Sequence, residues 1–224
     1  MFDIEFCLAH FQNYLLRNNL IYDLDQLRTV SIQLEQLFLA NCLQNLQRNF
    51  NGTTLHIILG EASQNVTNYV YGENAAGIRR NSFLPVRVVI PQMAVNDFTA
   101  QSYQNALARQ GVIIIDTCPL PLPSDYYRGK RGKPKYTPDN NHVTQFLNHT
   151  CTLLQEFLLE FRNIQSIKVI RRYKKIEGAF RLHLEKELES RINPNIQIVG
   201  FENSLSNGAG NIDVRIYNEF LNGN

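Results

Sequence analysis

Four short apolar segments, separated by stretches with helical periodicity, constrain the fold of this chain more than any other feature. The first is Leu55–Leu59, a nearly unbroken apolar run closed by Gly60, which is typical of a strand buried on both faces of a parallel sheet. Similar runs follow at 111–115, 166–170 and 196–200. The sequence therefore predicts four buried strands.

The stretches between these runs carry helical patterns. We predict helices over Asp97–Gln110, Asn141–Arg162 and Gly178–Arg191, the last of which is stopped by Asn193-Pro194. Strands that alternate with helices at this spacing form a mostly parallel sheet with both faces covered. The expected fold class is therefore a three-layer α/β/α sandwich with a mostly parallel four-stranded central sheet.

The first fifty residues follow a different pattern. From Phe2 to Asn49, apolar residues recur at spacings of three and four, which predicts two or three amphipathic helices. A chain of 224 residues is long enough for one large domain. We expect residues 1–50 to pack as helices on the core of an α/β domain formed by residues 51–224.

Composition and charge exclude several classes of protein. The hydrophobic content of 44% is that of a globular chain, and the longest apolar runs are far shorter than the roughly 20 residues that span a bilayer. We therefore expect no membrane partner. Because Met1–Glu5 lacks the basic residues of a secretory signal, we expect a cytoplasmic protein. A net charge of +2 does not by itself indicate a nucleic-acid partner.

Cysteine and histidine spacings favour neither a metal site nor a disulfide framework. Cys7, Cys42, Cys118 and Cys151 form no CxxC pair, which favours buried reduced thiols. The histidines show no HExxH spacing, and the chain contains no Walker loop or dinucleotide fingerprint. We expect no metal, no cofactor and a monomeric protein, with protein partners left open.

The residues that follow the strands are the candidates for a functional site, because ligands of parallel sheets bind beyond the carboxyl ends of the strands. Gly60-Glu61-Ala62-Ser63 follows the first strand, and its glycine lets the main chain approach a ligand closely. Asp116-Thr117-Cys118-Pro119 follows the second strand and begins with a carboxylate. Phe201-Glu202-Asn203-Ser204-Leu205-Ser206 follows the fourth.

These segments, in this order, resemble motifs of the uracil-DNA glycosylase superfamily. The first motif of one branch reads Gly-Glu-Ala-Pro, and Gly60–Ser63 is similar except for the proline. The second strand of the family reads Gly-Val-Leu-Leu-Leu-Asn-Thr, which resembles Gly111–Thr117, with Asp116 in place of the base-reading Asn. Asn81–Pro85 is similar to a Gly-x-x-Phe-x-x-Pro stretch whose Phe stacks on the extruded base, and Phe83 is that residue here.

The third motif departs further from the family. It reads His-Pro-Ser-Pro-Leu-Ser in family members, so Leu205 and Ser206 match while Phe201 stands in the place of the histidine. In one branch of the family an Asp of the first motif activates the water. This chain has Ala62 at that position. The resemblance covers about residues 55–221 and implies the family's fold without its two usual catalytic groups.

The resemblance implies an enzyme of base excision in DNA repair, which flips a uracil or other damaged base out of the stack and hydrolyses its N-glycosidic bond. Phe83 would stack on the base, with Tyr69 or Tyr71 as a second wall, and Gly60 and Ala62 would line it. The residues implied as contacts to DNA are Ser63, Asn203, Ser204, Leu205 and Ser206. The alternative for Phe83 is a core aromatic.

Two carboxylates, Glu61 and Asp116, are the candidate catalytic groups, with Asp213 as a third carboxylate. If two of them face one pocket, repulsion and desolvation raise the pKa of one, which then acts as an acid. An ionised Asp116 only accepts hydrogen bonds, so it repels the carbonyls of uracil and suits a base with an amino group. Alternatively, Asp116 caps a turn.

Two basic clusters predict contacts with phosphates. Five cations lie within 128–135, where Gly and Pro predict an exposed, mobile loop with Tyr126, Tyr127 and Tyr136 as flanking stacking surfaces. A second cluster, 171–175, follows the third strand. The predicted DNA-binding residues of these clusters are Lys130, Arg131, Lys133, Arg171 and Arg172. The alternative is a solvated loop with no partner.

Three functions are compatible with these features. The first is a DNA glycosylase with Glu61 or Asp116 positioning the water. The second is a catalytically inactive protein of the same fold that binds nucleic acid or a nucleotide through the basic clusters. The third is a small-molecule nucleoside hydrolase or transferase.

Overall fold

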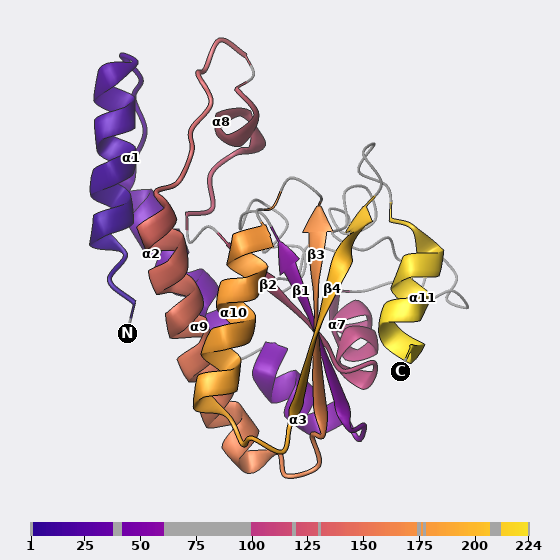
Figure 1. Ribbon diagram of the computed structural model, residues 1–224. Coiled ribbons are helices and arrows are strands. Elements are labelled where there is room, and N and C mark those ends of the chain that lie inside the picture. Colours follow the sequence, from indigo (N-terminus) through magenta and orange to yellow (C-terminus); the bar gives the residue numbers. More distant parts are fainter. Residues whose placement is uncertain are drawn as a thin grey trace.

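The computed structural model describes residues 2–37, 42–60, 100–117, 120–129, 131–173, 176, 178–206 and 212–223 (Figure 1). Within these residues, β1 (Thr54–Gly60), β2 (Val112–Asp116), β3 (Ser166–Tyr173) and β4 (Gln197–Ser206) form one sheet. Their order is β2-β1-β3-β4, and every neighbouring pair is parallel. The predicted parallel four-stranded sheet is confirmed.

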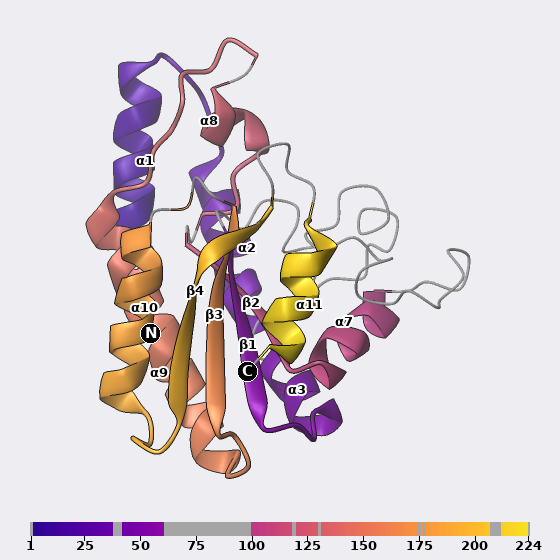
Figure 2. The ribbon, with the colours of Figure 1, turned by 45° about the vertical axis from the view of Figure 1, so that its right-hand side comes forward.

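Helices cover both faces of this sheet (Figures 1 and 2). On one face, α9 (Asn140–Glu160) packs against α10 (Gly178–Arg191), which contacts β3 and β4. On the other face, α7 (Ala100–Arg109) contacts β2 and α11 (Val214–Asn222) contacts β4. The short helix α3 (Gln44–Asn49) packs against α7. The architecture is the predicted α/β/α sandwich.

The centre of the sheet is apolar because β1 lies between two other strands and is covered on both faces. Leu55, Ile57, Ile58 and Leu59 are all fully buried. Burying each of these side chains stabilises the fold by roughly 1.5–3 kcal/mol. A strand in this position therefore requires the unbroken apolar run that predicted it.

β3 and β4 continue beyond the apolar runs that predicted them. β3 includes Arg171–Tyr173 and β4 includes Phe201–Ser206, so these residues lie within strands and do not follow them. The prediction that they follow the third and fourth strands is therefore wrong. The apolar pattern stops early on β4 because it is an edge strand, and an edge strand leaves several of its side chains exposed.

β4 contains a bulge near the carboxyl end of the sheet. Val169 of β3 pairs with Gly200, and Arg171 pairs with Ser204. Two steps along β3 thus correspond to four steps along β4, which leaves two extra residues on β4. Bulges of this kind bend a strand and redirect the side chains beyond them.

A second hydrophobic cluster lies beside the main core. It is built from α1 (Glu5–Arg17), α2 (Leu24–Leu37), α8 (Ser124–Arg128) and the segment that follows α8. The ring of Phe11 is fully buried at its centre and meets the rings of several tyrosines edge-on. In Figures 1 and 2, α1 and α8 stand at the end of the molecule toward which the strands point.

The three cysteines that the structure describes are not joined in disulfides. Cys7, Cys42 and Cys151 are buried, as predicted, and Cys118 lies outside the described residues. Burial raises the pKa of Cys151 to about 12, so this thiol is not a nucleophile at neutral pH.

Candidate ligand site at the carboxyl ends of the strands

Gly60, Asp116 and Arg172 lie side by side at the carboxyl ends of three neighbouring strands. Gly60 ends β1 and is the register partner of Asp116, which ends β2. On the other side of β1, Leu59 pairs with Arg171 of β3, which places Arg172 level with Gly60. The first-motif glycine and the second-motif carboxylate are therefore direct neighbours.

Asp116 and Arg172 share one face of the sheet, the face covered by α7 and α11. His56 Nε2 lies 3.2 Å from the carbonyl oxygen of Leu221 in α11, and Lys168 Nζ donates to a main-chain carbonyl at the end of that helix. Asp116 and Arg172 each lie four residues beyond the position that pairs with His56. Because side chains alternate along a strand, all of these point to the same face.

Gly60 lies between the side chains of Asp116 and Arg172 on this face. Neighbouring strands lie about 4.8 Å apart, so the main chains of β2 and β3 are roughly 10 Å apart here. No side chain from β1 stands between Asp116 and Arg172 because the intervening residue is glycine. A carboxylate that accepts hydrogen bonds and a guanidinium that donates them thus flank one glycine at the end of the sheet.

The side chain of Arg172 is buried, although the sequence placed it in an exposed cluster. The residue is only 3% exposed, and its guanidinium carbon lies 4.5 Å from the ring centroid of Tyr173. Burial lowers the pKa of this guanidinium. Arg172 points into the molecule because its position on β3 faces α7, so it is not a surface contact for DNA.

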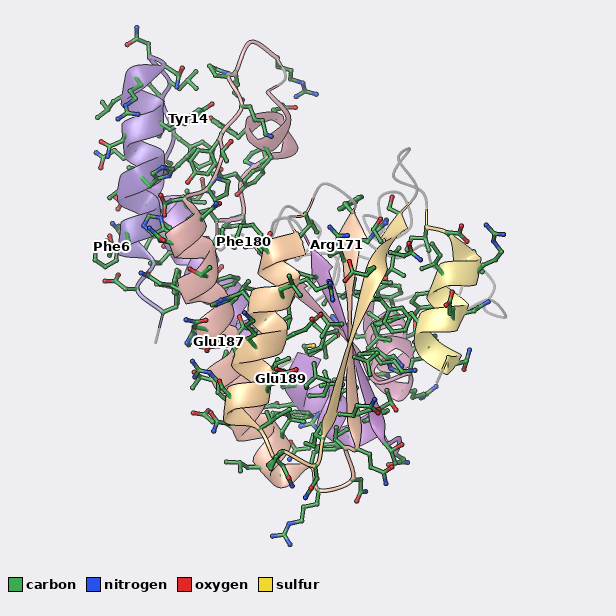
Figure 3. The ribbon with its side chains drawn as sticks, in the orientation of Figure 1. Phe6, Tyr14, Arg171, Phe180, Glu187 and Glu189 are labelled. Carbon is green, nitrogen blue, oxygen red and sulfur yellow. The ribbon has the colours of Figure 1, made fainter. Side chains whose placement is uncertain are left out.

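Arg171 points to the opposite face of the sheet, toward α10, and lies at the end of β3 (Figure 3). Its Nη1 donates to the carbonyl oxygen of Ile176 at 2.9 Å, and its Nη2 donates to that of Glu202 at 2.8 Å. Its register partner on β4 is Ser204, whose Oγ donates to the carbonyl oxygen of Ser206 at 3.0 Å. The structure thus brings Arg171 and Ser204 together.

The third-motif residues divide into exposed and buried members. Asn203 is exposed and Ser204 is half-buried, whereas Ser206 is only 5% exposed. Leu205 is fully buried in the main core, so its side chain does not reach a surface where DNA could contact it. Leu205 and Ser206 are consecutive, so their side chains point to opposite faces of the sheet, and both faces are covered at this end of β4, one of them next to α11.

Phe201, which the sequence resemblance aligned with a histidine, is a packing residue. Its ring meets that of Phe220 in α11 edge-on, with centroids 5.4 Å apart. Phe220 in turn meets the ring of His56 at 5.1 Å. This aromatic row helps to hold α11 on the sheet, so the side chain at position 201 supplies no polar group to the site.

The described part of the basic loop, residues 129 and 131–135, lies beyond the strand ends, at the same end of the molecule as the carboxyl edge of the sheet (Figures 1 and 2). Arg131 is strongly exposed, and its Nη1 lies 3.3 Å from Asp125 Oδ2. Lys133 Nζ lies 4.6 Å from the ring centroid of Tyr126. The basic loop is therefore held by contacts with Asp125 and Tyr126, while Arg131 is exposed to solvent.

The tyrosines that flank the basic loop do not face solvent. Tyr126, Tyr127 and Tyr136 are at most 5% exposed and belong to the second hydrophobic cluster. The amide of Tyr136 donates to the carbonyl of Tyr126 at 2.7 Å, and Tyr14 Oη donates to the carbonyl of Pro134 at 2.5 Å. The prediction that these tyrosines are stacking surfaces is wrong, because they anchor the loop to α1.

Several predicted site residues lie outside the described residues: Glu61, Ala62, Ser63, Tyr69, Tyr71, Phe83 and Lys130. Their catalytic, base-binding and DNA-binding roles stay predictions. The structure fixes Gly60, where the first motif begins, and its neighbour Asp116. Asp213, the third candidate carboxylate, caps α11 by accepting from the amide of Arg215 at 2.9 Å.

Sequence reasoning did not select Arg181 of α10, which is a buried cation beside β4. Arg181 is 3% exposed, its Nη1 lies 2.6 Å from Glu185 Oε1, and its Nη2 pairs with the carboxylate of Glu202. A Cβ at Gly200 would lie 1.9 Å from Arg181 Nη1, so only glycine leaves room for the guanidinium. The available signal was the i,i+4 pairing of Arg181 with Glu185 on a predicted helix.

Comparisons with known proteins yield no relative for this chain: no family model matches it, and neither a curated protein nor a solved structure does so. Within the part of the chain that the structure describes, no helix is long and apolar enough to cross a bilayer. The same residues contain no group of three or more His, Cys, Asp or Glu side chains that could hold a metal ion. The function must therefore be inferred from the site itself.

Proposed function

We propose that this chain is a divergent DNA glycosylase-like protein of the uracil-DNA glycosylase superfamily, which binds nucleic acid at the carboxyl edge of its sheet and hydrolyses the N-glycosidic bond of a flipped base. The observation that supports this most is the register pairing of Gly60 with Asp116. The motifs at the ends of the first and second strands can form one site only if both strands end at the same edge of the sheet. Gly60 and Asp116 are neighbours at that edge.

The proposed chemistry requires a carboxylate near the sugar and a polar group at the edge of the base. We assign the first role to Glu61, which follows Gly60, and the second to Asp116. Hydrolysis breaks the bond between the base nitrogen and C1′ of the sugar. Water adds its hydroxyl to C1′, and its remaining proton leaves with the base, so the reaction needs no cofactor.

Asp116 favours a base that carries an amino group. An ionised carboxylate accepts hydrogen bonds and donates none, so it pairs with an exocyclic amino group and repels a carbonyl at the same position. The guanidinium of Arg172 lies on the other side of Gly60 and supplies positive charge to the same face. A damaged or mispaired base with an amino group is therefore the preferred substrate in this proposal.

Phosphate contacts in this proposal come from the basic loop and from the end of β4. Arg131, Lys133 and Lys135 lie in the basic loop, and Asn203 and Ser204 lie at the carboxyl edge. Cations that neutralise phosphates release bound counterions, which makes such binding strongly salt-dependent. Both groups stand at the same end of the molecule, as one nucleic-acid strand requires.

A second candidate function, nucleic-acid binding without hydrolysis, is favoured by the packing of Phe201. The family's leaving-group histidine stands at this position, and here the side chain is an apolar contact of Phe220. No proton donor therefore comes from position 201. A protein that keeps the edge of the sheet but lacks this group would bind a flipped nucleotide and release it unchanged.

The test is base release from labelled oligonucleotides that carry uracil, hypoxanthine, xanthine, mispaired thymine or mispaired cytosine, followed by alkaline cleavage of abasic sites. Strand breaks that disappear with Glu61→Gln support the glycosylase. Binding without breaks supports the second candidate. Release of bases from free nucleosides, with no action on oligonucleotides, would instead identify a small-molecule hydrolase.

Binding is tested separately by fluorescence anisotropy at several salt concentrations. Neutralising Arg131 and Lys133 together should weaken affinity about tenfold and reduce the salt dependence by about two phosphate contacts. Arg162→Gln is the matched control, because Arg162 is exposed and lies before β3, at the opposite end of the sheet. Equal losses in both variants would mean that binding is unspecific attraction to a basic surface.

A further inference from the structure

Glu202 lies in the bulge of β4 and is held by two arginines from different elements. Arg171 of β3 binds its main chain, and Arg181 of α10 binds its carboxylate. The bulge is the point at which β4 departs from its register with β3, just before Asn203 and Ser204. The contacts of Glu202 therefore decide where these two residues lie.

Arg171 ties two segments of the carboxyl edge together. One arm of its guanidinium donates to Glu202 and the other to the carbonyl of Ile176, at 2.8 and 2.9 Å. Ile176 belongs to the connection that leaves β3, and it is buried. The planar fork of arginine can hold two carbonyls at once, whereas a lysine presents a single ammonium group at the end of a flexible chain.

Arg181 provides a buried support beneath the bulge. Its side chain is 4% exposed, and Glu185, which lies 2.6 Å away and is 14% exposed, balances its charge from within α10. The carboxylate of Glu202 approaches from the solvent side and is 85% exposed. Gly200 lets the guanidinium lie directly against β4, at the residue where the register changes.

We infer that Arg171 and Arg181 are positioning residues, which hold Glu202 by its main chain and its side chain and thereby fix the bulge of β4. The fixed bulge sets the place of Asn203 and Ser204 at the carboxyl edge of the sheet. The consequence for nucleic-acid binding depends on the proposed function. The bracing itself depends only on the contacts of Glu202.

The experiment combines amide hydrogen exchange with nucleic-acid binding. Arg171→Lys and Glu202→Gln are the test variants, because Arg181 is buried and its substitution risks unfolding the protein. We expect exchange at the amides of residues 203–206 to rise about tenfold in both variants, with the amides of β1 unchanged. Affinity for a fluorescein-labelled single-stranded oligonucleotide should fall about fivefold, in line with the loss of one or two polar contacts.

Glu187→Gln is the matched control. Glu187 makes an i,i+4 ion pair with Arg191 at 2.7 Å in the same helix, toward its other end and away from the strand ends (Figure 3). This control should leave both the exchange at 203–206 and the affinity unchanged. Hydrogen exchange at the amide of Ile176 is the second check. Arg171→Lys loses the guanidinium that binds the carbonyl of Ile176, whereas Glu202→Gln retains it. Glu202→Gln should therefore have the smaller effect on exchange at Ile176.

The outcomes separate the two claims. Unchanged exchange at residues 203–206 in both test variants overturns the bracing. Faster exchange with unchanged affinity confirms the bracing and overturns its role in nucleic-acid binding. If the unaltered protein binds no oligonucleotide at all, the proposed function fails, and the exchange measurement still decides whether the two arginines fix the bulge.

Discussion

β1 and β3 are neighbouring parallel strands of one sheet, yet they bury different kinds of residue. β1 buries four aliphatic side chains and His56, but no lysine or arginine, and it ends at Gly60. β3 buries three aliphatic side chains together with Lys168 and Arg172, and it ends in a row of charged and aromatic residues. Both strands are covered on both faces, so the difference does not arise from their position.

Buried cations lower the stability of a fold unless partners offset their desolvation. Burial lowers the pKa of both Lys168 and Arg172, which shows that this cost is present on β3. At the level of these two cations β1 carries no lysine or arginine but has His56, which pairs with Lys168, and Gly60, which lies level with Arg172. The comparison indicates that β1 supplies stability, whereas β3 and its edge neighbour β4 position polar groups.

The largest expected effect is the loss of an aliphatic side chain from β1. Ile57→Ala should lower the free energy of unfolding by about 4 kcal/mol, because the residue is fully buried and its neighbours cannot collapse into the space. Ile198→Ala, on the partly buried edge strand β4, should cost about 1 kcal/mol. Urea denaturation of both variants checks this, and equal losses would contradict the division between the two strands.

The next effect is a pH dependence that comes from His56, the polar residue of β1. Burial, assisted by the charge of Lys168, lowers the pKa of His56 to about 4. The unfolded chain has a histidine pKa near 6.5, so the folded state binds fewer protons between these values. Stability is therefore complete above about pH 6.5 and falls as pH decreases toward 4, by about 3 kcal/mol in all.

This pH dependence is measured as the difference between the protein and its His56→Gln variant across that range. The difference isolates His56, because all other groups titrate in both proteins. His183→Gln is the control, since His183 lies between α9 and α10, with its Nε2 2.6 Å from Asn148 Oδ1. A slope that survives in His56→Gln would show that another group is responsible.

A smaller effect is expected from Gly200→Ala on β4. The new Cβ would lie 1.9 Å from Arg181 Nη1 and 2.2 Å from Glu185 Oε1, so the buried ion pair must shift. We expect a loss of about 2 kcal/mol, the usual cost of overpacking a filled site. Gly178→Ala, where the nearest atom would be Arg171 Nη1 at an ordinary 3.7 Å, should leave thermal stability nearly unchanged.

The order of the strands and helices could be predicted because the chain separates apolar runs from helical periodicity. α10 begins and ends at the predicted residues, and β1 and β2 each differ from the prediction by one residue at both ends. The ends of β3 and β4 could not be predicted, because strand pairing there is made by the main chain and leaves no apolar pattern. Helix α8 is too short to show a helical repeat.

The site was predictable only in part, for a related reason. Parallel pairing brings strand ends together, so the meeting of Gly60 with Asp116 follows from topology alone. The burial of Arg172 depends on which face of β3 it occupies, and a run of two arginines does not reveal which of them points inward. The role of Arg181 depends on a glycine nineteen positions away along the chain, which sequence spacing cannot connect to it.

The smallest expected effect on stability belongs to Ser204→Ala, and it sharpens the comparison most. Ser204 Oγ donates to the carbonyl of Ser206 at 3.0 Å, and the residue is half-buried. Its loss should cost less than about 1 kcal/mol of unfolding free energy. If β4 positions polar groups for a ligand, oligonucleotide affinity should nevertheless fall severalfold, as measured by fluorescence anisotropy.

Thr152→Ala on α9 is the control. It removes a hydroxyl bound to Arg191 far from the strand ends, so it should change stability by a similar amount and leave affinity unchanged. If neither variant loses affinity, β4 has no role in binding.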